Sequence, residues 1–225
     1  MNFGGLVRKQ TMRLILIAVL FGLLGACADR KPPAHAAKPP VATQPTRSGS
    51  ADNCFKSLDQ RHVVFDRLAD FHDGEGCGVD QAVRLKRLEI PLDRPQLLSC
   101  PTALNLADFE IQVVAPAVMS HLGHKVTAIS SAGSYDCRGQ RGDHPERLSE
   151  HALGRAIDIT SFTLDDGRRI TVAKNWWGND SSADFLHEVA AGACKYFSVV
   201  LTPKSNRLHH DHLHLDNGPH KKCDA

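Results

Sequence analysis

The chain has 225 residues, of which 42% are hydrophobic and 23% charged, values that are ordinary for a globular protein. Its formal net charge is +2, but Arg8, Lys9 and Arg13 lie ahead of residue 27 with no acidic residue among them. The remainder carries 24 basic and 25 acidic residues and is nearly neutral. This balance argues against a nucleic-acid partner, because such partners are held by basic side chains that contact phosphates.

Residues 1–26 resemble a lipoprotein-type signal peptide rather than a folded element. Basic residues precede an apolar run over residues 14–24, which is too short to span a bilayer but suits a signal-peptide core. The run ends in Leu-Gly-Ala-Cys, which resembles a bacterial lipobox with Cys27 as the lipidated residue. An ordinary signal peptide with a chance cysteine is the alternative. We therefore expect an exported, periplasmic protein with a lipid anchor in a membrane.

A proline-rich stretch over residues 27–50 follows the expected anchor. It shows no apolar periodicity, and its prolines remove backbone donors and favour extended conformations. We expect a tether here, leading to one domain over residues 51–225.

Six cysteines remain in the expected domain, and an even number in an exported protein predicts three disulfides with the pairing left open. They are Cys54, Cys77, Cys100, Cys137, Cys194 and Cys223. A thiolate metal site is the alternative, but no two of these cysteines lie at the spacing of zinc ligands.

The first elements expected in the domain are a helix, a loop and a strand. Residues 63–71 fit one apolar helix face, and the glycines around Cys77 predict a loop. The near-alternation over residues 85–90 predicts a strand.

The strongest helix prediction covers residues 105–122, whose apolar side chains recur at helical spacing. Asn105 is the expected cap and Gly123 the expected stop. Pro116 is expected to kink the helix.

The second half of the domain combines short strands with one helix. Apolar or alternating runs predict strands over residues 125–130, 155–160, 169–172, 198–202 and 212–216. Residues 182–195 predict a helix, and Asp-Asp-Gly at residues 165–167 predicts a hairpin turn. The elements lack the regular rhythm of a parallel sheet. We therefore expect a single α+β domain with a largely antiparallel central sheet flanked by helices.

Two segments carry residues that suit a metal site. The first contains His151 and Asp158, and the second, over residues 209–216, contains His212 and His214. A catalytic zinc has about three protein ligands and an open position for water, and mixed histidine and carboxylate sets are common. An exposed acid on a strand is the alternative for Asp158.

The second segment has a geometry that can be argued from its alternation. In an extended strand His212, His214 and Asp216 share one face, while Leu213 and Leu215 face the core. Surface histidines or a loose metal-chelating tail are the alternatives, but a solvated tail would not need the leucines.

The motif residues of both segments resemble those of a known family. They are Ser149-Glu150-His151, Gly154, Ala156, Asp158 and His212-Leu213-His214. The resemblance, over about residues 54–223, is to the bacterial extensin-like C-terminal family. That family is similar in turn to the zinc D-Ala-D-Ala carboxypeptidases and to the lysostaphin and hedgehog metal-binding group. The resemblance implies a fold like theirs, with His151, Asp158 and His214 as ligands of Zn²⁺.

The resemblance also implies catalytic roles around the metal. Arg138 would face the scissile carbonyl and stabilise developing charge, the alternative being a structural ion pair in a loop pinned by Cys137. Asp211 occupies the position of the glutamate base of the carboxypeptidases, but it is one methylene shorter and strand alternation turns it away. We therefore prefer His212 as the base, with Asp211 as base or as an orienting residue. Glu150 and Asp216 are lesser candidates for contacts outside the ligands.

These expectations amount to a zinc-dependent metallopeptidase, of the D,D-carboxypeptidase or endopeptidase kind, acting on peptidoglycan stem peptides or cross-links. The first alternative is a zinc-containing binding or structural module without turnover. A metal-buffering lipoprotein that uses the histidine tract alone is a weaker alternative.

Overall fold

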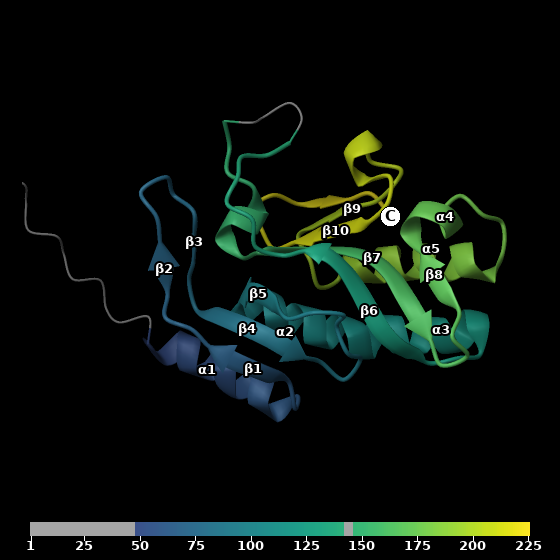
Figure 1. Cartoon of the computed structure of the whole chain (residues 1–225), viewed down its shortest axis with the longest axis horizontal. Helices are drawn as coiled ribbons and strands as arrows, with labels where there is room; N and C mark the ends of the chain where they lie inside the picture. The colour runs from purple at the N-terminus through teal and green to yellow at the C-terminus, as the bar shows by residue number, and fades with distance from the viewer. Residues whose placement is uncertain (1–47, 142–145) are drawn as a thin grey trace, which may run out of the picture. The chain divides into compact units, whose positions relative to one another are not determined.

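A computed structural model describes residues 48–141 and 146–225 of the chain (Figure 1). The helices are α1 (Ser48–Gln60), α2 (Cys100–Phe109), α3 (Ala115–Leu122), α4 (Val172–Asn175) and α5 (Ser181–Ala193), with shorter turns η1 (Glu110–Val114), η2 (Glu150–Leu153) and η3 (Arg207–His209). The strands are β1 (Val64–Arg67), β2 (Phe71–His72), β3 (Gly78–Val79), β4 (Ala82–Arg87), β5 (Gln96–Ser99), β6 (Val126–Gly133), β7 (Ala156–Leu164), β8 (Arg169–Thr171), β9 (Val199–Leu201), β10 (Leu213–Asp216) and β11 (Lys222–Cys223).

The expected signal peptide and Cys27 lie outside the described residues. The expected tether does so as far as residue 47, and α1 begins at Ser48. Within the described ranges, none of the helices has the length and apolar character needed to cross a membrane.

The central sheet has the strand order β11-β9-β10-β7-β6, with β8 also paired to β7. Its described pairings are antiparallel apart from the parallel pair of β9 and β11. Two smaller sheets, β1-β4-β5 and β2-β3, complete the strands. The prediction of an α+β domain with a largely antiparallel sheet is therefore confirmed, as is the hairpin turn between β7 and β8.

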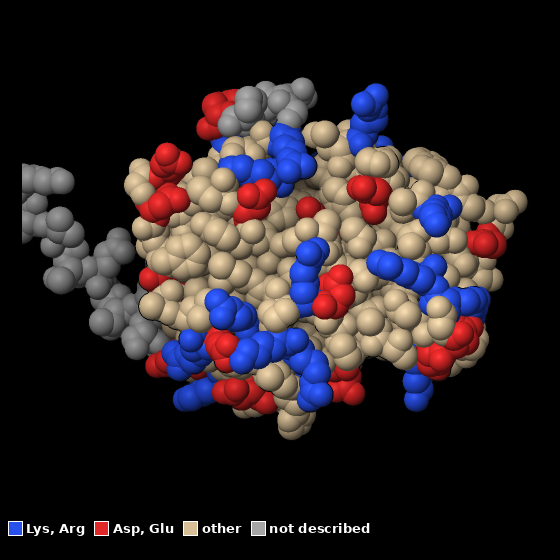
Figure 2. Space-filling view, viewed as in Figure 1, with Lys and Arg blue, Asp and Glu red and all other residues tan. Residues whose placement is uncertain are grey.

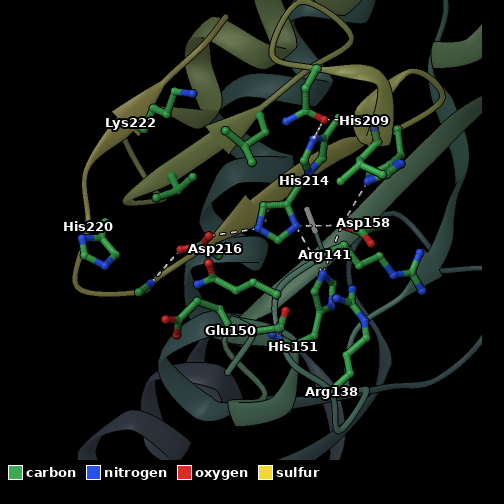
Figure 3. Close-up of a pocket in the computed structure, with 18 residues that line it drawn as sticks. Arg138, Arg141, Glu150, His151, Asp158, His209, His214, Asp216, His220 and Lys222 are labelled. Atoms are coloured by element: carbon green, nitrogen blue, oxygen red, sulfur yellow. Dashed lines mark hydrogen bonds and ion pairs between the residues drawn. The ribbon is translucent and has the colours of Figure 1, made fainter. Parts of the chain in front are cut away.

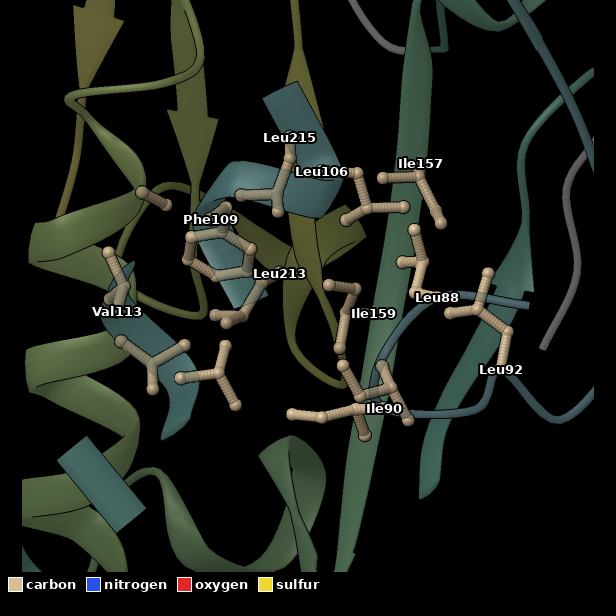
Figure 4. Close-up of a cluster of buried hydrophobic side chains, with 14 of the residues drawn as sticks. Leu88, Ile90, Leu92, Leu106, Phe109, Val113, Ile157, Ile159, Leu213 and Leu215 are labelled. Carbon is tan, nitrogen blue, oxygen red and sulfur yellow. The ribbon is translucent and has the colours of Figure 1, made fainter. Parts of the chain in front are cut away.

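The two faces of the central sheet differ in chemistry. The inward side chains of β7 and β10 are fully buried; they are Ile157, Ile159, Leu213 and Leu215. They join the hydrophobic cluster with Leu106 and Phe109 of α2 (Figure 4). Because successive side chains of a strand alternate between its faces, Asp158 and His214 point to the opposite side. The leucine alternation thus places the polar residues of both strands together.

The helix predicted over residues 105–122 begins earlier than expected, at Cys100. Pro101 occupies its first turn, where the missing backbone N–H costs nothing. Asn105 is not a cap but lies inside α2, and its Nδ2 donates to the carbonyl of Tyr196 over 2.8 Å. The π-helical turn η1 precedes Pro116, and Gly123 ends α3 with a φ of 65°. The predicted stop is confirmed and the predicted cap is wrong.

The helix predicted over residues 63–71 is also wrong, because strands β1 and β2 occupy this segment. β1 pairs with β4, and β2 pairs with β3. The apolar residues do not share one buried face, since Val64 and Phe71 are exposed. Pairing with later segments has overridden the local helical pattern.

Three disulfides form, as predicted, and the structure supplies their pairing. They are Cys54–Cys100, Cys77–Cys137 and Cys194–Cys223. The first joins α1 to α2, and the third joins the end of α5 to β11. The second ties the residue before β3 to the loop after β6, immediately beside Arg138. The oxidised pairing argues against the thiolate alternative for these cysteines.

Basic and acidic side chains are interspersed over the face seen in Figure 2. No broad field of one sign covers the described residues in this view. This distribution agrees with the near-neutral composition of the chain beyond residue 26.

Candidate metal centre

His151 is carried by the short turn η2, which glycine and a capping serine fix in place. Ser149 precedes the turn, and its hydroxyl accepts a hydrogen bond from the backbone N–H of His151. Gly154 ends the turn with a φ of 62°, and a Cβ at this position would lie 2.8 Å from a methyl of Val79. Both the left-handed conformation and the close approach require glycine here.

Asp158 and His214 come from neighbouring strands. They are direct partners in the antiparallel register of β7 and β10, on the polar face of the sheet. Side chains that are opposite each other in such a pair have neighbouring Cβ atoms. The register therefore brings the carboxylate and the imidazole together without help from a loop.

The three predicted ligands meet at one point beneath the protein surface (Figure 3). Oδ1 of Asp158 lies 2.9 Å from Nδ1 of His214 and 3.3 Å from Nε2 of His151. The two ring nitrogens are 3.2 Å apart. The side chains of His151, Asp158 and His214 are 4%, 15% and 12% exposed, so water only partly solvates the cluster.

The outward nitrogens of both imidazoles donate to groups that can only accept. Nδ1 of His151 donates to the backbone carbonyl of Ser134, and Nε2 of His214 donates to Oδ2 of Asp216 over 2.9 Å. Asp216 is buried and also accepts from the backbone N–H of Gly218. In the neutral rings, these bonds leave the inward nitrogens as bare lone pairs that converge on a carboxylate oxygen.

The electrostatics of the cluster favour a cation. Burial lowers the pKa of His214, but hydrogen bonds and charges from Asp158 and Asp216 raise that pKa to about 9. Against the effect of burial, His151 and His214 hold the pKa of Asp158 well below its ordinary range. Two imidazole nitrogens and one carboxylate oxygen form a donor set that suits zinc, so the residues fit the expected ion.

The comparisons with known proteins give a family. The extensin-like protein C-terminus family matches residues 52–224. The chain belongs to this extensin-like family. Comparison with curated proteins and with solved structures produced no match.

Two further groups of possible ligands occur in the described part of this extensin-like domain. One contains Cys77 and Cys137, whose sulfurs are joined to each other in a disulfide. The other contains His124, Asp165 and Asp166, where two partly exposed carboxylates already lie 2.7 and 3.2 Å from the two ring nitrogens. Neither group has the buried, converging lone pairs of the His151 cluster.

His212 joins the cluster, and Asp211 reaches it only through His212. Nε2 of His212 is 3.6 Å from Oδ1 of Asp158, and its Nδ1 is 2.9 Å from Oδ1 of Asp211. The strand begins at Leu213, after both residues. Asp211 is about half exposed and is not among the described residues that line the cavity. Its position is that of an orienting residue for the imidazole.

A cavity of about 450 Å³ opens over the cluster in this extensin-like domain. Arg138 lines it, and its guanidinium is fixed by Oδ2 of Asp136 at 2.7 Å and by the carbonyl of Gly139. The structural ion pair expected for Arg138 is present, and it fixes the guanidinium at the cavity wall. Glu150 also lines the cavity, where burial raises its pKa, and pairs with Arg155 at 3.6 Å.

Several cavity residues were missed by the sequence reasoning. They are Arg141, Asn206, Leu208, His209, His220 and Lys222, among others. The ring centroid of His209 lies 5.2 Å from that of His212 and 5.6 Å from that of His214. Burial, with the two neighbouring histidines, lowers the pKa of His209 to about 4. The density of histidines from residue 209 onward was the available signal for this residue.

Proposed function

We propose that this extensin-like domain is a zinc-dependent metallopeptidase that cleaves peptidoglycan peptides in the cell envelope. One observation carries the proposal. The possible ligand atoms of His151, Asp158 and His214 lie within 4.8 Å of one another, at the floor of a cavity large enough for part of a peptide. Such a mixed set of three ligands is typical of catalytic rather than structural zinc sites.

His151, Asp158 and His214 would hold the zinc ion, which would supply a Lewis acid that polarises a carbonyl and activates water. His212 is the proposed base, because its Nε2 faces the cluster while its Nδ1–H is held by Asp211. This tautomer presents a lone pair toward the cavity and can take a proton from the attacking water. Asp211 then stabilises the imidazolium that results.

Arg138 is proposed to stabilise the negative charge that develops on the scissile carbonyl oxygen. Its guanidinium is held at the cavity wall by Asp136, so the charge needs no rearrangement during the reaction. The planar guanidinium still has N–H groups to direct at an anionic oxygen.

The substrate class comes from the resemblance and from the expected location. The family resembles zinc D-Ala-D-Ala carboxypeptidases and the lysostaphin group, whose substrates are peptides of the cell wall. The lipobox-like sequence that ends in Cys27 and the proline-rich segment after it would hold the domain at a membrane that faces this wall. We therefore propose an anchored periplasmic lipoprotein that acts on stem peptides or their cross-links.

The test is digestion of purified peptidoglycan and of a soluble stem pentapeptide, followed by mass spectrometry. The zinc-loaded chain should release D-alanine or separate cross-linked peptides, and a His214→Ala variant should not. His210→Ala is the matched control, because His210 is exposed and lies outside the cavity residues. Zinc-loaded protein that leaves every bond intact would contradict the proposal.

A second candidate is a zinc-containing binding or structural module without turnover. The position of Asp211 favours it, because the residue at the place of the carboxypeptidase base is half exposed and turned toward His212. This candidate predicts one bound zinc, no cleavage, and unchanged peptide binding after His212→Ala.

A further inference from the structure

His209 lies on the cavity wall and is fixed there by one side chain. Oδ1 of Asn206 accepts from the backbone N–H of Leu208 at 2.8 Å, which caps η3, and from Nδ1 of His209 at 2.9 Å. Because the amide oxygen only accepts, Nδ1 of His209 carries the hydrogen and Nε2 carries the lone pair. The same asparagine therefore sets both the turn and the orientation of the ring.

Nε2 is the ring nitrogen of His209 that the hydrogen bond to Asn206 leaves as an acceptor. In the part of the chain that the structure describes, Nε2 of His209 has no hydrogen-bond partner. The ring packs against His212 in a tilted arrangement and against His214 edge-on. Rotation of the ring would break these contacts and the hydrogen bond to Asn206. An acceptor fixed on a cavity wall is placed to accept a hydrogen bond from a molecule that enters the cavity.

The opposite wall has the complementary chemistry. Figure 3 shows His209 on one side of the His151–Asp158–His214 cluster and Arg138 on the other. The guanidinium of Arg138 can only donate, whereas Nε2 of His209 accepts. A trans peptide unit presents its C=O and its N–H in opposite directions, so it can satisfy a donor on one wall and an acceptor on the other.

We propose that His209 is a substrate-positioning residue, whose Nε2 accepts a hydrogen bond from an N–H of the peptide substrate on the side of the metal centre away from Arg138. This inference rests on the proposed function, since it takes the ligand to be a peptide. It gives the cavity a direction: carbonyl or carboxylate oxygens lie toward Arg138, and an N–H lies toward η3.

The test compares His209→Phe with His210→Phe, using the zinc-loaded full chain and a soluble stem pentapeptide. Phenylalanine keeps a ring against His212 but removes the acceptor. KM for His209→Phe should rise about three- to tenfold, with kcat within about twofold and zinc content unchanged, as expected for one lost hydrogen bond. His210→Phe should match the wild type. Asn206→Ser, which can still cap η3 but is shorter, should also raise KM.

The outcomes separate this inference from the proposed function. If the wild type binds the pentapeptide without cleaving it, the proposed function fails, and the dissociation constants, measured by calorimetry, replace KM in the comparison. A His209→Phe variant with the wild-type constant overturns the inference, and so does loss of zinc from that variant, which would make His209 a ligand. A wild type that binds no pentapeptide overturns it as well, even if it digests intact peptidoglycan.

Discussion

His214 donates its Nε2–H to Oδ2 of Asp216 over 2.9 Å, on the side of the ring away from Asp158. Both residues belong to β10, where positions two apart share one face. One short strand therefore supplies a proposed ligand and the carboxylate that orients its ring. Asp216 is only 5% exposed, so water does not compete for this bond.

Asp216→Asn should weaken zinc binding about 10- to 100-fold, because the ligand loses the carboxylate that fixes its tautomer and raises its basicity. Competition with a chromogenic chelator measures the affinity. Asp211→Asn is the control and should bind zinc as the wild type does, since Asp211 contacts His212 and no ligand. Equal zinc affinity in the Asp216 variant and the wild type would refute the assigned orienting role.

His212→Ala should lower kcat by about 10²- to 10⁴-fold while the zinc content stays at the wild-type level, as expected for loss of a general base. Asp211→Asn should lower kcat less, because the imidazole remains but its tautomer is no longer fixed. Initial rates on the stem pentapeptide and metal analysis of the same samples give both quantities. If His212→Ala loses its zinc, the residue is a ligand and not the base.

Replacing Cys77 and Cys137 together with alanine should reduce both stability and turnover. Loss of a cross-link over 60 residues should cost about 2–4 kcal/mol in unfolding free energy, and it frees the loop that holds Arg138. The matched variant removes the Cys54–Cys100 disulfide, whose cysteines are 46 residues apart in the sequence and do not line the cavity. Its loss should reduce stability alone. Urea unfolding and pentapeptide turnover distinguish the two variants. Equal turnover in the two variants would show that the Cys77–Cys137 disulfide is not needed to hold Arg138 in place.

The side of the sheet on which His214 and Asp216 lie could be predicted from the sequence because it follows from strand alternation. Leu213 and Leu215 face the core, so His214 must face away, and the antiparallel register then sets it opposite Asp158. Asp216 shares that face for the same reason. Local pattern and tertiary structure agree here, which is why this part of the site could be anticipated.

The remainder of the site depends on contacts that no local pattern encodes. The turn η3 has three residues and no periodicity, so neither its fold nor the place of His209 in the cavity followed from the sequence. The helix predicted over residues 63–71 failed for a related reason, since β1 is stabilised by pairing with β4 about twenty residues later. The pairing of the six cysteines likewise required the tertiary structure.

Glu110 should make the stability of the domain depend on pH. Burial raises the pKa of its carboxyl from 4.5 to about 8. The backbone N–H groups of Glu89 and Ile90 donate to the carboxylate oxygens and oppose this rise, but their effect is smaller. The folded state then holds this proton more tightly than the unfolded state, so stability should fall as pH rises from about 4.5 to about 8. The loss should be on the order of a few kcal/mol.

Glu110→Gln isolates this effect from other titrating groups. The variant cannot ionise, so the difference in unfolding free energy between wild type and variant should shift in favour of the variant as pH rises. Urea unfolding at pH 5, 6.5 and 8 measures it. A difference that stays constant over this range would show that Glu110 is ionised throughout.

His151, Asp158 and His214 are proposed to bind one zinc ion, and metal analysis of the purified chain after reconstitution measures this binding. We expect one zinc per chain in the wild type and in a His124→Ala control, and almost none in His214→Ala. A wild-type chain that takes up no zinc, or a His214→Ala chain that holds as much zinc as the wild type, would contradict it.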